Sequence, residues 1–328
     1  MKVLVTGGTG FVGTHLVNAL LRRRHEVAVL ARDDRATRNR YNRTVETVRG
    51  DVLDGASLAA ACSGRDAVIH LVAIIHEGKG QTFEQIHHQA VENLVKAMTS
   101  AGVRRLLHMS AMGVAPDAPS LYARTKAAGE GAVRSSSLAW TIVRPSIIFG
   151  PGDGFFSLLA GVVRANPGFI PIIGPGTTRF QPVSVYDVAR VYAEALEKPE
   201  TSGAAFDVGG PETFTLNELY REVAIVVGKP RKPMIHLPLW WGAFVAGRFE
   251  WMTRRGWLAD PPLTRDQLKS LSRDNVADVS GTLRVFGGDW KRLRPGLREY
   301  LHGAMKHDPR VGLGQEVDLE PVKVLRLE

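Results

Sequence analysis

Residues 2–13 read KVLVTGGTGFVG, and this stretch constrains the fold more than any other part of the chain. An apolar, β-branched run leads directly into Gly7, Gly10 and Gly13, after which apolar residues recur at helical spacing. This order predicts a buried strand, a tight glycine turn and the start of a helix. Glycines let the backbone approach a ligand, and the unpaired N–H groups of a first helical turn attract phosphate. We therefore expect this turn to bind the pyrophosphate of a dinucleotide; a glycine turn without a ligand is the alternative.

Strand-like and helix-like segments alternate along roughly the first half of the chain. The strands are short and apolar with little polar alternation, which is typical of strands buried on both faces. The expected strands are residues 2–6, 26–32, 45–50, 66–73, 104–110 and 140–146, and the expected helices are 11–24, 55–62, 82–101 and 120–137. The alternation predicts an α/β fold with a doubly wound parallel sheet of the Rossmann type.

The composition changes after residue 150, where glycine- and proline-rich segments are typical of the loops of a smaller lobe. We expect a dinucleotide-binding domain, a smaller C-terminal substrate lobe and a surface tail. The dinucleotide-binding domain is expected at 1–150, with later segments at about 183–228 that return to its sheet. The substrate lobe is expected at 151–182 and 229–302, and the tail at 303–328.

The bulk properties of the chain narrow its class. It has 328 residues, 44% of them hydrophobic, which is typical of a protein with a large core. It has a single cysteine, Cys62, which excludes an internal disulfide. A chain without disulfides is typical of a reducing compartment such as the cytoplasm. No apolar run reaches the roughly 18 residues of a membrane span, and the first strand begins too early for a signal peptide. The net charge of +9 suits an anionic ligand or membrane surface, but no recognition motif accompanies it, so we expect no nucleic-acid partner.

Several motifs together resemble the extended and atypical short-chain dehydrogenase/reductases, the NAD-dependent epimerase/dehydratase type. The motifs are TGGTGFVG (6–13), RGDVLD (49–54), HLVA (70–73), YARTK (122–126) and VRPSIIFGPGD (143–153). Within this family the chain looks most like the NAD(P)H-binding accessory subunit of respiratory complex I and its stand-alone bacterial relatives. HMSAMG, SLYARTKAAGE and PPLTRDQLKSL carry that narrower resemblance.

The resemblance implies cofactor-binding roles for residues at the ends of several strands. Asp51 would accept a hydrogen bond from the adenine amino group, and Val52 would pack on the ring. The alternative for Asp51 is a plain strand-end turn. The other implied cofactor-binding residues are Gly7, Thr9, Gly10, Phe11, Val12 and Gly13 at the pyrophosphate, Leu71, Val72 and Ala73 beneath the ribose and nicotinamide, and Pro145 and Ile148 behind the nicotinamide.

Arg32 ends the second expected strand, where an NAD-preferring site usually has an acidic residue for the ribose 2′-hydroxyl. An arginine instead pairs with a 2′-phosphate, and Arg35 and Arg38 are near enough in sequence to assist. This substitution favours NADP(H) over NAD(H). The alternative is a solvated basic loop that Asp33 and Asp34 partly neutralise.

Tyr122 and Lys126 stand four residues apart on an expected helix, so both reach the same side. That spacing suits carbonyl reduction, in which Tyr122 donates a proton to the developing alkoxide as hydride arrives. We expect the Lys126 ammonium to lower the pKa of Tyr122 and to hold the ribose hydroxyls. Ser110 would orient the substrate oxygen, and Ala111 is the other candidate for that position. The alternative is a relic that binds cofactor without turnover.

Two features qualify this assignment. The family usually has an asparagine where this chain has His87, and this difference concerns catalysis more than cofactor binding. His76, His87 and His88 are near one another in sequence, but no carboxylate or cysteine at ligand spacing completes a metal site. We therefore expect no metal.

Residues 237–258 hold four of the six tryptophans, interleaved with Arg248, Arg254 and Arg255. A helical lid over the substrate pocket would place the apolar residues inward. A helix lying on a membrane surface or on a partner protein would place them outward. The pattern alone leaves both readings open.

Taken together, the residues and the resemblance predict an NADP(H)-binding short-chain dehydrogenase/reductase-like protein. We expect hydride transfer to or from a carbonyl group of a small-molecule substrate. One alternative is a non-catalytic NADPH-binding accessory or sensor subunit of a membrane respiratory complex. The other is an NAD-dependent sugar-nucleotide epimerase or dehydratase. The expected location is the cytoplasm, with the inner face of a membrane as a second possibility.

Overall fold

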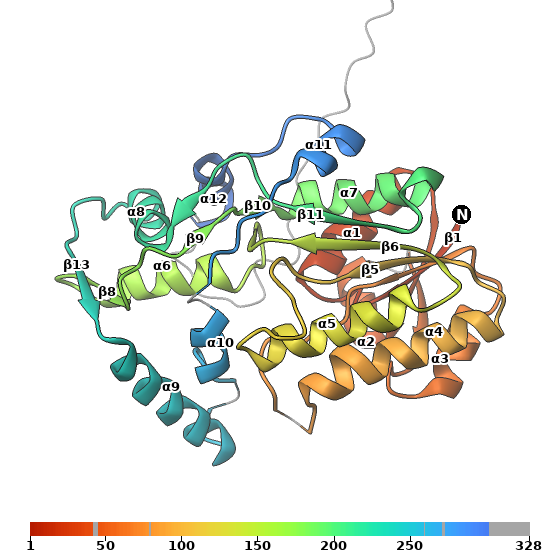
Figure 1. Ribbon diagram of the computed structural model, residues 1–328, viewed down its shortest axis with the longest axis horizontal. Coiled ribbons are helices and arrows are strands. Elements are labelled where there is room, and N and C mark those ends of the chain that lie inside the picture. The colour runs from red at the N-terminus through yellow and green to blue at the C-terminus, as the bar shows by residue number, and fades with distance from the viewer. Residues whose placement is uncertain (42–44, 79, 259, 271–272, 302–328) are drawn as a thin grey trace, which may run out of the picture.

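The computed structural model of the protein is shown in Figure 1. It describes residues 1–41, 45–78, 80–258, 260–270 and 273–301. The surface tail expected at 303–328 lies outside the described residues.

A sheet of seven parallel strands forms the centre of the described structure, in the order β11-β6-β5-β4-β1-β2-β3. The strands are β1 (Lys2–Thr6), β2 (Glu26–Ala31), β3 (Glu46–Arg49), β4 (Ala67–His70), β5 (Arg105–Met109), β6 (Ala139–Pro145) and β11 (Ala204–Val208). The six strands expected before residue 150 are all present, and the expected doubly wound α/β fold is confirmed. Successive strands are added outward from β1 on one side through β2 and β3 and on the other side from β4 onward. Ligands of such folds bind at the carboxyl edge of the sheet beside this switch point between β1 and β4.

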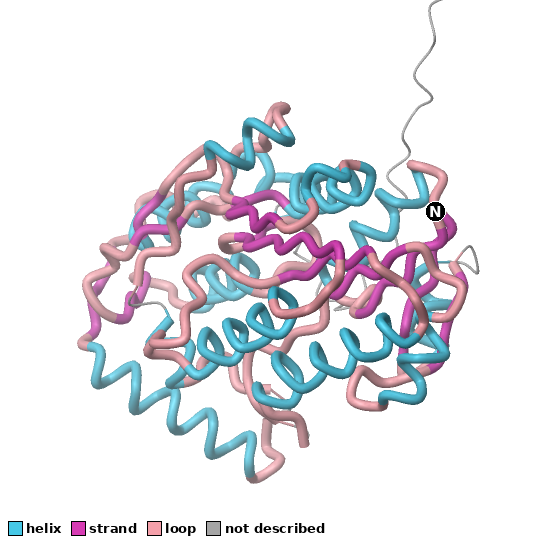
Figure 2. Tube along the Cα trace, turned by 45° about the vertical axis from the view of Figure 1, so that its right-hand side comes forward, coloured by secondary structure: helices cyan, strands magenta, loops and turns pink. Residues whose placement is uncertain are grey.

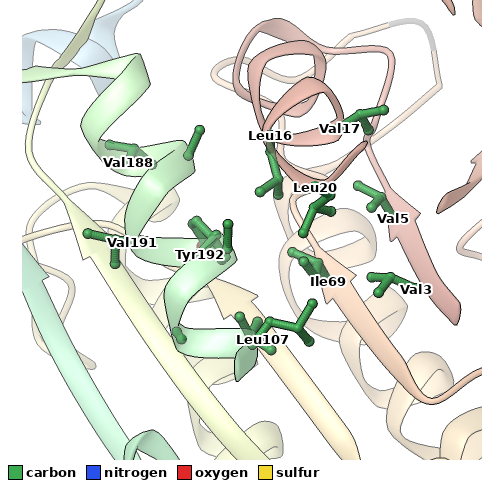
Figure 3. Close-up of a cluster of buried hydrophobic side chains, with 14 of the residues drawn as sticks. Val3, Val5, Leu16, Val17, Leu20, Ile69, Leu107, Val188, Val191 and Tyr192 are labelled. Carbon is green, nitrogen blue, oxygen red and sulfur yellow. The ribbon is translucent and has the colours of Figure 1, made fainter. Parts of the chain in front are cut away.

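Helices cover both faces of the sheet. On one face, α1 (Phe11–Arg22) and α7 (Val185–Glu197) pack against each other and the strands. Figure 3 shows this core, in which Leu16, Leu20 and Tyr192 meet apolar strand residues and are fully buried. The other face is covered by α3 (Gly55–Cys62), α4 (Ala90–Ser100) and α5 (Leu121–Arg134).

Two helical segments differ from expectation. The segment α2 (Asp34–Tyr41) is helical although its sequence, DRATRNRY, lacks an apolar stripe. Its only buried residues, Thr37 and Tyr41, supply too short a pattern to predict it. The helix expected at 82–101 begins as a π-helical turn, η1 (Gln85–Gln89), and continues as α4.

A third apolar core lies beyond the sheet edge. It is built from α6 (Phe155–Ala165), α8 (Leu216–Val226), α12 (Leu293–Leu301) and β8 (Ile170–Ile173). We expected residues 183–228 to return to the sheet. From this range, β11 joins the sheet and α7 packs on it. Helix α8 instead packs on α6 and α12, because its buried stripe matches their apolar faces.

The remaining elements lie between the sheet and the third core or along the margins of either. They are β7 (Ile148–Phe149), β9 (Arg179–Phe180), β10 (Val183–Ser184), η2 (Pro199–Thr201), β12 (Phe214–Thr215), β13 (Met234–Leu237), α9 (Leu239–Arg254), α10 (Arg265–Ser270) and α11 (Ser280–Phe286). Figures 1 and 2 show α9 at the periphery of the molecule, with α10 between α9 and α5 in Figure 1. Among the described residues, no helix is both long and apolar enough to cross a membrane.

Candidate active site

The glycine turn after β1 is built by close backbone contacts. Gly7 has a φ of +77°, and its carbonyl oxygen accepts a hydrogen bond from Gly10 N–H at 3.0 Å. A Cβ at Gly13 would overlap the Gly7 carbonyl oxygen, so that helix α1 approaches the turn only because Gly13 has no side chain. Gly10 is the N-cap of α1, and no side chain caps that end through a hydrogen bond. The first N–H groups of α1 therefore remain available for a phosphate.

A tyrosine that the sequence analysis missed supports this turn from behind. The Tyr41 hydroxyl donates a hydrogen bond to the Gly8 carbonyl oxygen at 2.5 Å, and burial raises the pKa of Tyr41 to about 12. The neighbouring Arg40 donates to the Thr14 hydroxyl at 3.0 Å. Helix α2 thus fixes the turn and brings a guanidinium to the first turns of α1.

The strand ends next to this turn carry the residues expected at the adenosine half of a dinucleotide. Gly50 N–H donates to the Ala31 carbonyl at 3.1 Å, which places Arg32 and Asp51 on adjacent strand ends. The Arg32 side chain is exposed. One carboxylate oxygen of Asp51 accepts from Leu53 N–H at 2.9 Å, and Val52 is buried in the core below.

The backbone that follows β4 runs beside the glycine turn. A Cβ at Gly7 would come within 3.0 Å of the Leu71 carbonyl carbon and 3.1 Å of Val72 N. Leu71 and Val72 are half-buried, whereas Ala73 is exposed. On the far side, Phe11 packs near Gly152, and Pro145 is buried at the end of β6. Its neighbour Ile148 is half-buried.

Tyr122 and Lys126 lie in the first turns of α5, as expected. The half-buried Tyr122 ring meets the rings of Phe83 and His87 edge-on, with centroids 5.9 and 5.1 Å away. Lys126 is 3% exposed, and its ammonium donates to the Met109 carbonyl at 2.5 Å. The helix therefore presents a phenol and a buried ammonium at the carboxyl edge of the sheet.

The pKa of each member of this pair is moved by burial. Burial raises the pKa of Tyr122 to about 12 and lowers the pKa of Lys126 to about 8, with Glu130 opposing the second shift. We expected Lys126 to lower the pKa of Tyr122, and that expectation is wrong, because burial raises this pKa instead. The Lys126 ammonium is engaged by the strand carbonyl, and the removal of the phenol from water dominates.

Ser110 lies directly after β5 and is buried. Its hydroxyl approaches the Glu130 carboxylate, although no hydrogen bond of normal geometry joins them. Burial alone would raise the pKa of Glu130, but bonds of 2.7 and 2.5 Å from Arg144, with the nearby Ser110, bring it below its usual value. Ser110 is thus placed beside the Glu130–Arg144 pair, and the neighbouring Ala111 is half-buried.

His87 joins the strand edge to α5. Its Nε2 lies 3.2 Å from Ile74 N and 3.1 Å from Ile74 O, and its Nδ1 lies 3.0 Å from the Thr125 hydroxyl. A Cβ at Gly129 would overlap the His87 carbonyl, so α5 packs closely on the π-helical turn. Burial, and then the Lys126 charge, lower the pKa of His87 to about 3. The ring is therefore neutral and rigidly held at neutral pH.

Two more buried histidines form a polar row across the sheet. His70 Nδ1 lies 2.7 Å from the Thr6 hydroxyl, and the His70 and His108 rings stack with centroids 5.5 Å apart. Burial, and then Lys126, lower the pKa of His70 to about 3, and burial lowers that of His108 well below its usual value. These rings are neutral core residues in register on adjacent strands.

Two residues that the sequence analysis did not identify tie the C-terminal segments to this edge. Asn275 accepts from the Ser146 hydroxyl at 2.5 Å and donates to the Met112 carbonyl at 3.2 Å. The carboxylate of Asp266 accepts from the backbone N–H groups of Leu121 and Tyr122. Asp266 lies within the PPLTRDQLKSL segment, which indicated a resemblance but no role for this residue, and Asn275 belongs to no motif named above. Within the described residues no group of three potential metal ligands is present.

Comparison with known proteins places this site in a family. The family model for the NAD dependent epimerase/dehydratase family matches residues 3–209. Over 222 residues the chain is 33% identical to the mitochondrial NADH dehydrogenase (ubiquinone) 1 alpha subcomplex subunit 9 of Arabidopsis thaliana. That match covers 66% of this chain but 55% of the plant protein, so the chain spans about half of that relative's length.

A second relative and a solved structure extend the comparison. The chain is 31% identical over 241 residues to the ceramide reductase of Caulobacter vibrioides, covering 72% of this chain and 73% of that protein. A nucleoside-diphosphate-sugar epimerase from Staphylococcus aureus has the same fold, with a TM-score of 0.72 and 19% identity, covering 91% of this chain and 100% of the epimerase. This structural likeness concerns the fold alone.

Proposed function

This chain belongs to the NAD dependent epimerase/dehydratase family, and from that premise we propose that it is an NADP(H)-dependent oxidoreductase acting on a carbonyl compound. The observation that carries the proposal is the pairing of Tyr122 with the buried Lys126 at the carboxyl edge of the sheet, beside the glycine turn. A phenol and an ammonium at this position suit proton delivery to a substrate oxygen.

The glycine turn supports dinucleotide binding because its backbone leaves no room for side chains. Gly7 and Gly13 form a cradle that any Cβ would fill, and the uncapped N-terminus of α1 offers N–H groups and a positive dipole to phosphate. The dinucleotide, when bound, supplies or accepts the hydride. Leu71, Val72 and Ala73 would support its ribose and nicotinamide, with Pro145 and Ile148 on the opposite side.

A basic strand end supports NADP(H) over NAD(H). Arg32 is exposed at the end of β2, with Asp51 on the adjacent strand end. A guanidinium pairs with a 2′-phosphate through two hydrogen bonds, whereas a 2′-hydroxyl is better served by a carboxylate. One carboxylate oxygen of Asp51 already accepts a hydrogen bond from Leu53 N–H. Its other oxygen would accept a hydrogen bond from the adenine base.

The proton chemistry falls to Tyr122. Because burial raises its pKa to about 12, Tyr122 is protonated at neutral pH and ready to donate to a carbonyl oxygen as hydride reaches the carbonyl carbon. The alcohol is then complete, and a tyrosinate remains. A proton from solvent would then restore the phenol, and Lys126, whose buried ammonium is bonded to the Met109 carbonyl, would hold the ribose hydroxyls of the dinucleotide.

The substrate class is inferred from a relative and from the apolar character of the C-terminal lobe. The relative from Caulobacter vibrioides is named a ceramide reductase, and ceramides are lipids with long hydrocarbon chains. In this chain α10 bonds to the start of α5 and also contacts α9, which carries exposed tryptophans. We therefore propose an apolar ketone with a long chain, with the carbonyl directed at Tyr122.

The test combines binding with turnover. The full chain, freed of bound nucleotide, should bind NADPH more tightly than NADH in calorimetry and oxidise it with a panel of long-chain oxo lipids. Tyr122→Phe should lower turnover by about a hundredfold or more and leave the NADPH affinity unchanged. Absence of binding to either coenzyme would defeat the proposal. Tightly held NAD with interconversion of nucleotide sugars would instead indicate an epimerase.

A second function is favoured by one relative. The Arabidopsis protein is a subunit of NADH dehydrogenase, and this chain has His87 where an asparagine is usual. A non-catalytic NADPH-binding subunit of a membrane complex would retain Lys126 and the glycine turn without turnover. NADPH binding without oxidation by the whole panel, together with co-purification in a respiratory complex, is the result expected for this alternative.

A further inference from the structure

Helix α9 contacts the rest of the protein through its smallest residues. Gly242 and Ala246, one turn apart, are the buried residues of this helix. A Cβ at Gly242 would overlap Ile173 of β8, and a Cβ at Gly247 would overlap the Arg265 guanidinium of α10. The helix backbone therefore lies close against β8 at Gly242 and against α10 at Gly247, and large side chains are excluded at these two contacts.

Several of the largest side chains of α9 are exposed. Trp240 is 70% exposed and Phe244 is 62% exposed, and Trp251 follows at seven residues' spacing. At about 100° per residue these positions lie opposite Gly242 and Ala246. An ordinary surface helix has the reverse arrangement, with its apolar side inward and its polar side outward.

Two arginines complete the same face. Arg248 and Arg255 lie between and beyond the aromatic residues, with their guanidinium carbons 5.8 and 5.5 Å from the Trp251 ring centroid. We name Trp240, Phe244, Arg248, Trp251 and Arg255 the outward stripe. Trp257, 66% exposed, extends it beyond the helix end and meets Trp251 edge-on at 5.1 Å.

The charge of the outward stripe has one sign. The single acidic residue of α9, Glu250, is directed to α10, where it accepts a hydrogen bond from Arg265 N–H at 2.8 Å. The stripe itself therefore carries aromatic rings and cations. The chain as a whole has a net charge of +9.

We propose that the outward stripe docks on the surface of a bilayer that contains anionic phospholipids, with α9 lying parallel to the membrane. Aromatic rings of this kind insert at the boundary between headgroups and acyl chains, and neighbouring arginines pair with lipid phosphates. A cluster of exposed aromatic residues would otherwise be a costly surface in water.

Charge favours a bilayer over a second copy of this chain. In a twofold dimer through this face, each stripe would meet its own image, so the arginines of both copies would be brought together without an acidic partner. An anionic membrane offers phosphates to all of them at once, and each basic residue near such a surface adds to the affinity.

The docking surface is also connected to the candidate active site. Arg265 and Asp266 are adjacent in α10: Arg265 contacts α9, and Asp266 accepts hydrogen bonds at the start of α5, which carries Tyr122. Docking would therefore place the active-site entrance near the lipid phase. This last step rests on the proposed function, whereas membrane docking itself does not.

The experiment is vesicle co-sedimentation of the full chain. Binding to vesicles of phosphatidylcholine mixed with phosphatidylglycerol should exceed binding to phosphatidylcholine alone by about tenfold or more, and high salt should remove the difference. Tryptophan emission should shift to the blue on binding. The paired variants Trp240→Ser/Phe244→Ser and Arg248→Glu/Arg255→Glu should each lose about tenfold or more in affinity.

Leu158→Ser and Leu283→Ser, which remove exposed leucines from α6 and α11, are the matched controls and should bind vesicles as the parent does. Unchanged thermal unfolding and NADPH affinity would show that the variants are folded. Equal binding by the parent and the stripe variants would overturn the proposal. So would a dimer in sedimentation that Trp240→Ser/Phe244→Ser dissociates, or tryptophans of the stripe that are shielded from quenchers in a monomer without vesicles.

Discussion

Asp266 of α10 holds Tyr122 of α5 by its backbone: the Asp266 Oδ2 atom accepts a hydrogen bond from Tyr122 N–H at 3.1 Å. Its other oxygen accepts from Leu121 N–H at 2.8 Å. A carboxylate from a segment more than a hundred residues away therefore satisfies the N–H groups at the start of the helix that carries the proposed proton donor. This contact makes the C-terminal lobe part of the candidate active site.

Replacement of Asp266 by alanine should affect both stability and turnover. Ser120 still caps α5, but loss of the carboxylate that accepts from two further N–H groups costs about 1 kcal/mol of the free energy of unfolding and would let Tyr122 shift. Asp278→Ala is the control, because Asp278 accepts from Ser280 N–H at 2.9 Å at the distant helix α11. Thermal unfolding should show similar losses for both variants, and only Asp266→Ala should lower turnover. Equal turnover in the two variants would contradict a role for Asp266 at the site.

Gly13→Ala should impair folding and dinucleotide binding together. Its Cβ would overlap the Gly7 carbonyl oxygen, which is backbone and has little freedom to move. We expect a loss of several kcal/mol in stability, or no detectable NADPH binding where the variant folds. Gly131→Ala is the matched control, since Gly131 is exposed in the last turn of α5 and a Cβ there meets nothing within 4 Å. That variant should gain about 0.5–1 kcal/mol by favouring the helix.

The sequence predicted those parts of the fold that depend on local patterns. The strand from Lys2 to Thr6, the glycine turn and the start of α1 form one continuous signal, because apolar runs, glycines and helical spacing are each readable without the rest of the chain. The spacing of Tyr122 and Lys126 placed both residues on one helix for the same reason.

The parts that escaped prediction depend on distant contacts. Helix α2 has no apolar stripe, and its position comes from the bond between Tyr41 and Gly8. The shift in the pKa of Tyr122 was predicted in the wrong direction. Burial of the phenol and the bond from Lys126 to Met109 both depend on the tertiary structure, which the local sequence does not show. Asp266 reaches the site by a chain path that no spacing rule encodes.

Arg32→Ala should separate the two nicotinamide coenzymes. If Arg32 binds a 2′-phosphate, its loss removes charged hydrogen bonds and should weaken NADPH about tenfold to a hundredfold in calorimetry. The NADH affinity should stay within about twofold, because NADH has no 2′-phosphate for Arg32 to bind. Arg221→Ala, at an exposed position of α8, should change neither affinity. An unchanged NADPH affinity in Arg32→Ala would show that the exposed Arg32 guanidinium does not bind the cofactor and is a solvated surface group.

The buried histidines make a prediction about acid stability. His70 and His87 have folded-state pKa values of about 3, against about 6.5 for an exposed histidine, because burial disfavours their charged forms. Between pH 6.5 and pH 3 the unfolded chain therefore binds protons that the folded chain does not. Stability must rise with pH across that window and fall as the solution is acidified through it. Each ring accounts for a loss on the order of 2 kcal/mol at pH 5.

His87→Gln tests this account by its slope rather than by its stability at a single pH. The variant breaks the contacts with Ile74 and Thr125 and should be less stable at pH 7, but it no longer takes up a proton on unfolding. Urea unfolding between pH 7 and pH 4.5 should show a pH dependence that is shallower than the parent's by up to about 1.4 kcal/mol per pH unit. His236→Gln, at an exposed position of β13, should leave the slope as it is in the parent. A parent whose stability is flat over this range would show that the buried rings are already charged in the fold.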